Sequence, residues 1–220
     1  PGEINADLDV RVLPDIQASH PGVLYTHEGS KSEERDTIAG LQRGFALALL
    51  MIYALLAIPL RSYFQPLVIM SAIPFGLVGA VWGHLLMGMD MTILSMFGIV
   101  ALAGVVVNDS LVLVDFINRR RVIHPLEVAV REAGVARFRP ILLTSLTTFF
   151  GLLPLLLERS LQARFLIPMA VSLSFGVLFA TFITLVLVPA GYLIAEDVKT
   201  AARGLLGQPS PDPDPAQKPA

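Results

Sequence analysis

The sequence lacks cysteine and has few charged residues, and both absences narrow what the protein can do. None of its 220 residues is cysteine, which excludes disulfides, thiolate chemistry and cysteine-based metal sites. Asp, Glu, Lys and Arg make up only 15% of the residues, and the formal net charge of −2 gives no electrostatic basis for binding nucleic acid. We therefore expect no nucleic-acid partner, and no residue pattern indicates a cofactor.

The sequence is rich in apolar residues. They make up 54% of the sequence, which is too much for a soluble domain of this length and indicates a membrane protein. The chain begins with Pro1, shows no signal peptide and opens in a polar segment, so we expect a fragment of a longer chain.

Five apolar stretches are near or above the length that crosses a hydrocarbon core of about 30 Å. A capping-box pair, Ser30 and Glu33, predicts that the first stretch is the inner part of one long helix over 31–60. We expect an all-α membrane fold, a five-helix transmembrane bundle over 31–197. The five predicted spans are residues 43–60, 67–87, 93–117, 140–157 and 165–194.

The two ends of the chain differ from the bundle. Residues 1–30 alternate well enough for a short β segment of two strands, whose partner strands we expect outside this chain because two strands alone do not make a stable sheet. His20, His27 and Glu28 match no metal-site spacing, and we expect no metal there. The proline-rich tail, 198–220, is predicted to be disordered.

The link between the third and fourth spans is rich in arginine. Because positively charged loops stay on the cytoplasmic side, this link predicts a cytoplasmic C-terminus and an N-terminal segment on the outer side of the membrane. Residues 125–136 within the link can form a short amphipathic helix along the membrane surface. The arginines could also bind lipid, but topology alone accounts for them. They are Arg119, Arg120, Arg121, Arg131, Arg137 and Arg139.

Asn108, Asp109 and Ser110 stand side by side inside the third apolar stretch. A charged side chain deep in a transmembrane helix costs roughly 2.5 to 3.5 kcal/mol on insertion scales, and commonly marks an ion path, a proton relay or a buried partner. On the next span, Thr144 and Thr148 share a face at a similar depth. Hydroxyls both donate and accept hydrogen bonds, so they can hold an acid in either protonation state. The pattern predicts a proton relay.

Structural roles are the simpler interpretation at several neighbouring positions. Ser145 and Thr147 are expected to bond only their own helix backbone. Asp115, close to the arginines, is expected to be solvated or paired with one of them. Gly98 is expected to allow close helix contact, and His84 to serve as an interfacial anchor.

Two segments carry a resemblance to a known family. GVVVNDSLVLVDFINRRR, followed by ARFRPILLTSLTTFFGLLPLL, is similar in order and spacing to the C-terminal half-bundle of RND-superfamily efflux permeases. The hydrophobe/amphiphile multidrug type, the AcrB-like one, is the type it resembles most. The resemblance covers about residues 20–197. It implies that the five helices are the eighth to twelfth of twelve, and that residues 1–30 end a periplasmic porter-type domain.

The resemblance implies a transporter rather than an enzyme. Members of this type are trimeric proton antiporters of the inner membrane, which export hydrophobic or amphiphilic small molecules through a periplasmic adaptor and an outer-membrane channel. The family's relay positions fall on Asn108, Asp109, Thr144 and Arg137. Because the best-known members have a lysine where this chain has Asn108, their charge movements do not carry over, and Asp109 is expected to bear the proton itself.

Other functions stay open beside this one. Metal-ion efflux by the same superfamily is the weaker transporter alternative, because no Met or His pair lines the helices in a convincing way. A non-catalytic membrane scaffold or translocase subunit would need Asp109 only to pair with a partner helix. An intramembrane aspartyl protease fits poorly, because it needs two acids at one depth and only Asp109 is deep.

Overall fold

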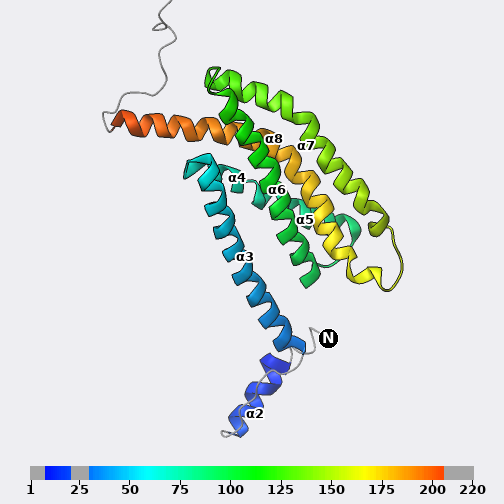
Figure 1. Ribbon diagram of the computed structural model, residues 1–220. Helices are drawn as coiled ribbons and strands as arrows, with labels where there is room; N and C mark the ends of the chain where they lie inside the picture. Colours follow the sequence, from blue (N-terminus) through cyan, green and yellow to red (C-terminus); the bar gives the residue numbers. More distant parts are fainter. Residues whose placement is uncertain (1–7, 21–29, 206–220) are drawn as a thin grey trace, which may run out of the picture. The chain divides into compact units, whose positions relative to one another are not determined.

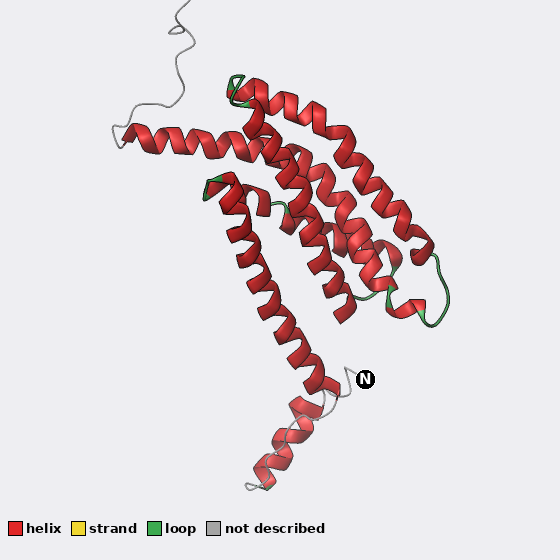
Figure 2. Ribbon diagram, viewed as in Figure 1, coloured by secondary structure: helices red, strands yellow, loops and turns green. Residues whose placement is uncertain are grey.

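The computed structural model describes residues 8–20 and 30–205, and every regular element within those ranges is a helix (Figures 1 and 2). The chain forms two compact units, Pro1–Gly44 and Phe45–Ala220. Helix α3 (Ser30–Leu60) contributes to both. The candidate relay residues all belong to the second unit.

The described residues of the first unit are helical where the sequence predicted a β segment. A π-helical turn covers Leu8–Val12, and α2 covers Leu13–Ser19. The strand prediction is therefore wrong across these residues, while the second predicted strand falls in 21–29, outside the described residues. The reason is physical: a strand needs a neighbour to bond its backbone, whereas a helix bonds its own.

Five helical segments of the described chain are long and apolar enough to cross a membrane, which confirms the predicted number of spans. These segments are Arg35–Leu60, Phe64–Met87, Ile93–Arg120, Leu126–Leu156 and Ile167–Val198. After α3, the helices are α4 (Phe64–Met70), α5 (Ile73–Met87), α6 (Ile93–Arg120), α7 (Leu126–Leu156) and α8 (Ile167–Leu205), with a 3-10 turn at Ala163–Phe165.

Proline interrupts the second span but not α7. The second span is divided into α4 and α5 at Ser71–Ala72, just before Pro74, which cannot donate a backbone hydrogen bond. In contrast, α7 runs through Pro140 and joins the predicted surface helix, 125–136, to the fourth span. The prediction of a separate surface helix is therefore wrong, and Figure 1 shows α7 as one curved ribbon. Pro140 is exposed, so its ring does not displace a packed neighbour.

Helix α8 extends beyond the predicted last span. It continues to Leu205, so the predicted disorder of 198–220 is wrong over its first part, and residues 206–220 lie outside the described residues. The helix contains Pro189, and its ribbon turns where yellow passes to orange in Figure 1. A proline ring clashes with the preceding helical turn and kinks the helix, which accounts for such a bend.

Helix α8 is the centre of the second unit, because it contacts α4, α5, α6 and α7. Two glycines let its neighbours come close. A Cβ added to Gly79 of α5 would lie 2.5 Å from Phe179 Cβ, and one added to Gly98 of α6 would overlap the carbonyl oxygen of Met169. The predicted close contact at Gly98 is confirmed, and α6 is held firmly against α8 at this point.

Candidate functional site

Helix α6 carries a buried acid, Asp109, within its membrane span. The residue is only 9% exposed, and Val106 and Leu113, one helical turn away on either side, are buried in the apolar core. Among the residues that the structure describes, none forms a hydrogen bond or ion pair with the Asp109 carboxyl group. Burying an unpaired carboxylate is costly, and a bound proton is the simplest partner that removes the charge.

Asn108 lies on a different side of α6 from Asp109. Successive helical residues are about 100° apart around the axis, since one turn takes about 3.6 residues. Asn108 is exposed, as are Gly104 and Ala101 on the same side of the helix. The two adjacent relay candidates therefore do not share one environment: Asp109 lies inside the second unit and Asn108 lies on its surface.

The predicted threonines bond the backbone of their own helix. The Thr144 hydroxyl donates to Pro140 O at 2.9 Å, and the Thr148 hydroxyl donates to Thr144 O at 2.8 Å. Thr147 donates to backbone carbonyls in the same way, as expected. Thr144 is exposed and Thr148 is half-buried, and no hydrogen bond joins either to Asp109.

Ser145 is the α7 hydroxyl that reaches another helix. It is fully buried and hydrogen-bonds the hydroxyl of Thr181 on α8, so the expectation that Ser145 bonds only its own backbone is wrong. Each hydroxyl also lies near a backbone oxygen of its own helix, at 3.0 Å for Ser145 and 2.7 Å for Thr181. One turn after Thr181, Thr184 Oγ1 is buried and has no partner among the described residues. Sequence reasoning missed Thr181 and Thr184, although their spacing in the last apolar stretch indicates that both hydroxyls lie on one side of the helix.

Arg137 occupies a polar surface region beside the end of α6. Its guanidinium lies 4.8 Å from the ring centre of Phe116, and its Nε is buried with no partner among the described residues. It also borders a cavity of about 520 Å³ together with Asp115 and Asn118. Asp115 accepts a 2.8 Å hydrogen bond from Arg119, which confirms its expected pairing with an arginine.

A polar network joins three helices at the arginine-rich end of the bundle, which we define as the end carrying the link between α6 and α7. Asn118 of α6 exchanges two 3.0 Å hydrogen bonds with Gln65 of α4 and accepts a 2.6 Å bond from the hydroxyl of Tyr192 on α8. Sequence reasoning missed this network, because nothing in the spacing of these residues indicates that they meet.

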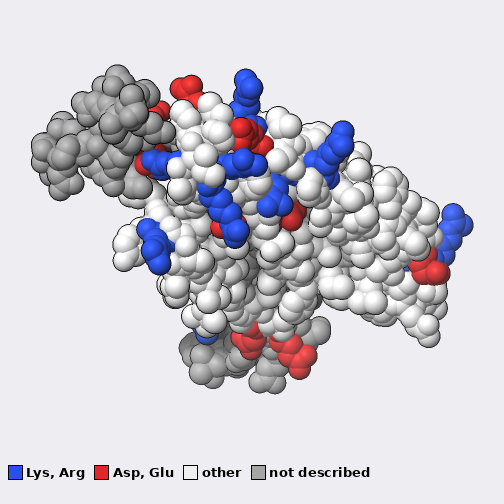
Figure 3. Space-filling view, turned by 45° about the horizontal axis from the view of Figure 1, so that its top comes forward, with Lys and Arg blue, Asp and Glu red and all other residues white. Residues whose placement is uncertain are grey.

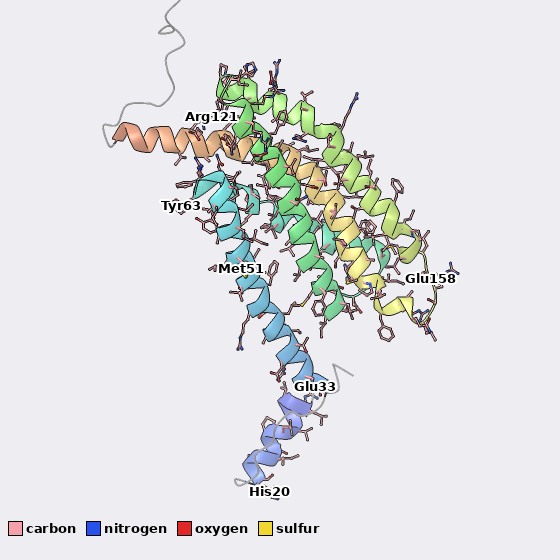
Figure 4. All side chains as sticks on the ribbon, in the orientation of Figure 1. His20, Glu33, Met51, Tyr63, Arg121 and Glu158 are labelled. Carbon is pink, nitrogen blue, oxygen red and sulfur yellow. The ribbon has the colours of Figure 1, made fainter. Side chains whose placement is uncertain are left out.

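An ion pair reinforces the same end. Arg121 donates to Glu196 at 2.8 Å, and the two side chains are 26% and 11% exposed. The hydrogen bond to Glu196 is the main cause that raises the pKa of the Arg121 guanidinium above its ordinary value. Figure 4 labels Arg121 where α6 ends, beside α8, and labels Glu158 at the other end of the bundle.

His84 forms a buried link between α5 and α6. Its side chain is 2% exposed, its Nδ1 lies 2.9 Å from Ala80 O, and its Nε2 lies 2.7 Å from Ser95 Oγ. If Nδ1–H donates to the carbonyl, Nε2 accepts from the serine hydroxyl. Ser95 also accepts the Thr92 N–H at the start of α6. The prediction of an interfacial anchor is wrong for His84, because both ring nitrogens have protein partners.

The fold and this arrangement describe a polytopic membrane helix bundle whose third span carries the buried acid Asp109. The family model of the AcrB/AcrD/AcrF family matches residues 12–196, and the chain belongs to this family of RND efflux permeases.

Two similar proteins are named for metal resistance and for cation efflux. The chain is 31% identical over 175 residues to the cobalt-zinc-cadmium resistance protein CzcA of Cupriavidus metallidurans and, to the same extent, to the cation efflux system protein CzcA of an Alcaligenes species. The aligned region covers 79% of this chain and 16% of each relative. The chain thus spans about a sixth of the length of these curated relatives.

The similar solved structures are also of a metal efflux protein. Two crystal forms of a heavy metal efflux pump match with TM-scores of 0.69 and 0.71 at 27% and 25% identity. They cover 85% and 87% of this chain, and the chain covers 20% and 19% of theirs. These findings favour the metal-efflux alternative over the multidrug interpretation.

Proposed function

We propose that this chain forms part of the membrane bundle of a proton-driven permease that exports divalent metal cations. The single observation that carries the proposal is Asp109, an acid buried in α6 with no partner among the described residues. Acids at such depth commonly belong to proton relays. The names of the similar proteins, which state cobalt-zinc-cadmium resistance, cation efflux or heavy metal efflux, support a metal cation as the substrate.

In this proposal Asp109 binds and releases the coupling proton. The buried hydroxyls of Thr184 and of the Ser145–Thr181 pair belong to helices that contact α6. They are suited to pass a proton or hold a water, because a hydroxyl can both donate and accept. Asn108, Thr144, Thr148 and Arg137 are secondary relay candidates. Of these, Asn108 and Thr144 are exposed and would act only after the rest of a permease covers them.

The proposed assembly follows the family resemblance. The arginine-rich end is placed in the cytoplasm by the positive-inside rule, which puts the N-terminal segment in the periplasm and the permease in the inner membrane. A homotrimer working with a periplasmic adaptor and an outer-membrane channel is the assembly that the resemblance implies.

A proton-flux assay tests the role of Asp109. A full-length permease carrying this sequence is placed in liposomes that contain a pH-sensitive dye, and a zinc gradient is applied. Asp109→Asn is expected to reduce zinc-driven proton flux to the level of empty liposomes. Asp115→Asn is the matched control on the same helix, and is expected to keep the flux, because Asp115 is already paired with Arg119. Normal flux in Asp109→Asn contradicts the relay.

The same liposomes separate the alternative functions. Proton flux driven by an amphiphilic dye such as ethidium, but not by zinc, would identify the multidrug type. No flux with either substrate in the unmodified protein would identify a scaffold or translocase subunit. Size-exclusion chromatography checks that each variant still assembles.

A further inference from the structure

The arginine-rich end of the second unit contains a cavity of about 390 Å³ between α6 and α7. Its lining is part apolar and part charged, with two guanidinium groups and one carboxylate. The lining residues are Phe116, Arg120, Arg131, Glu132, Val135 and Ala136. Figure 3 shows arginine side chains, in blue, gathered over this end of the molecule, with acidic side chains, in red, among them. The cavity therefore combines a positive side with an apolar side.

The two arginines of the cavity are free to bind a further acceptor. Arg120 Nη1 lies 3.6 Å from Glu132 Oε2, which is longer than the roughly 2.7–2.9 Å of a strong charge-assisted hydrogen bond. Arg131 is exposed and has no ion pair among the described residues. The single carboxylate thus neutralises at most one of the two guanidinium groups, and both keep N–H donors for an added anion.

Two guanidinium groups, those of Arg120 and Arg137, lie over the ring of Phe116. The guanidinium of Arg120 lies 5.3 Å from its ring centre, and that of Arg137 lies 4.8 Å from it. The Nε of Arg137 is buried and lacks a partner in the part of the chain that the structure describes. Two like charges on one ring repel each other, so an anion bound beside them lowers the electrostatic energy. The positive-inside rule explains why arginines occur in this loop. It does not explain why two of them lie over one aromatic ring.

Apolar side chains border the same place. Phe116, Val135 and Ala136 line the cavity, and Val135 is exposed. A free phosphate ion would leave this apolar surface in water, whereas a phospholipid would cover it with its glycerol and acyl portions. Basic pockets beside transmembrane helices are suited to anionic headgroups.

We propose that this cavity binds the headgroup of an anionic phospholipid. The phosphate accepts hydrogen bonds from Arg120 and Arg131, for which the planar guanidinium fork is well shaped, and the apolar portion packs on Phe116 and Val135. The site does not depend on which substrate the permease exports, because it uses none of the relay residues except Arg137, which contacts only the ring.

Native mass spectrometry tests the site. A full-length permease carrying this sequence is purified without bound lipid, and dioleoylphosphatidylglycerol, dioleoylphosphatidylcholine or inorganic phosphate is added. Phosphatidylglycerol is expected to bind at least about tenfold more tightly than phosphatidylcholine, and excess inorganic phosphate is expected not to displace it. The double variant Arg120→Gln/Arg131→Gln is expected to lose this preference.

A charge-matched control makes the result specific. Arg159→Gln/Arg164→Gln removes the same charge from the opposite end of the bundle and is expected to keep the preference. Equal loss in both double variants, no preference in the unmodified protein, or displacement by inorganic phosphate would each overturn the proposal. Arg131→Glu is a second test that leaves the Arg120–Glu132 contact in place, and an unchanged preference in that variant also contradicts the site. A thermal unfolding curve for each variant checks that it is folded.

Discussion

The two ends of the second unit are held together by different kinds of contact. At the arginine-rich end, Asn118 and Tyr192 take part in hydrogen bonds between side chains of three helices. At the opposite end, α6 meets α8 at Gly98, where the backbones leave no room for a side chain, and His84 adds one buried hydrogen bond to Ser95. Polar side chains can exchange their partners for water, whereas closely packed backbones cannot adapt. We therefore expect a side chain added at the Gly98 end to lower the free energy of unfolding strongly. A hydrogen bond removed at the arginine-rich end should lower it moderately.

The largest effect is expected from Gly98→Ala. The new Cβ would overlap Met169 O and lie 2.9 Å from Ser172 Cβ, so α6 must move away from α8. We expect the free energy of unfolding to fall by about 1–3 kcal/mol, as for an overpacked core. Gly151→Ala on α7 is the control, because no atom lies within 4 Å of its added Cβ. It should be neutral or stabilising by up to about 1 kcal/mol from helix propensity. Denaturant unfolding in detergent measures both, and similar values would refute the close contact.

A smaller loss is expected from Glu196→Gln. The amide can still accept a hydrogen bond from Arg121, but the charge of a partly buried pair is removed, so we expect a loss of about 1–2 kcal/mol. The control Asp115→Asn alters the exposed pair with Arg119, for which exposed ion pairs predict a loss of less than about 1 kcal/mol. An equal loss of unfolding free energy in the control and in Glu196→Gln would show that the Arg121–Glu196 pair stabilises the fold no more than an exposed ion pair does.

The hydroxyl of Tyr192 is expected to contribute about 1 kcal/mol. Tyr192→Phe keeps the buried ring and removes the hydrogen bond to Asn118 together with the 3.2 Å bond accepted from Gln65, while Gln65 still bonds Asn118. Tyr63→Phe is the control, because the Tyr63 side chain is exposed (Figure 4). Equal unfolding free energies for the two variants would show that the network adds no stability.

The smallest effect is expected at the other end, from Glu158→Gln. Backbone N–H groups of Ser160 and Arg159 bond the carboxylate and hold the pKa of Glu158 below its ordinary value of 4.5. A lowered folded-state pKa contributes stability above the unfolded-state value, and that contribution is lost as the pH falls through the folded-state pKa. The two proteins should therefore differ slightly at pH 7 and converge well below pH 4.5. A difference that grows on acidification would contradict this account.

Much of the bundle could be predicted because membrane spans are specified locally. Length and hydropathy were enough for five spans, since each helix satisfies its own backbone hydrogen bonds in the bilayer. The errors fall where the outcome depends on contacts: residues 8–19 are helical instead of extended, α7 continues through Pro140, and α8 continues to Leu205. Local patterns alone cannot reveal whether a neighbour will pair a strand or support a helix.

The candidate site was predictable in part. The burial of Asp109 could be predicted from its position within an apolar stretch, but its lack of a hydrogen-bond partner among the described residues could not. Thr144 and Ser145 are adjacent in sequence, yet Thr144 is exposed and Ser145 is the residue that bonds α8. One residue along a helix changes the direction of a side chain by about 100°, so small differences in helix rotation decide which hydroxyl is inside.

By itself, the sequence determined the class of the protein: five apolar helices, an acid within the third, and arginines gathered in one link, because hydrophobic length and charge act without reference to the rest of the fold. Only the tertiary structure decided which side chains meet. The placement of Asn108 on the surface, the links of Asn118 and His84 to neighbouring helices, and the cavity beside Phe116 all depend on how the helices rotate and cross, and this is set by the packing of α8 against its four neighbours.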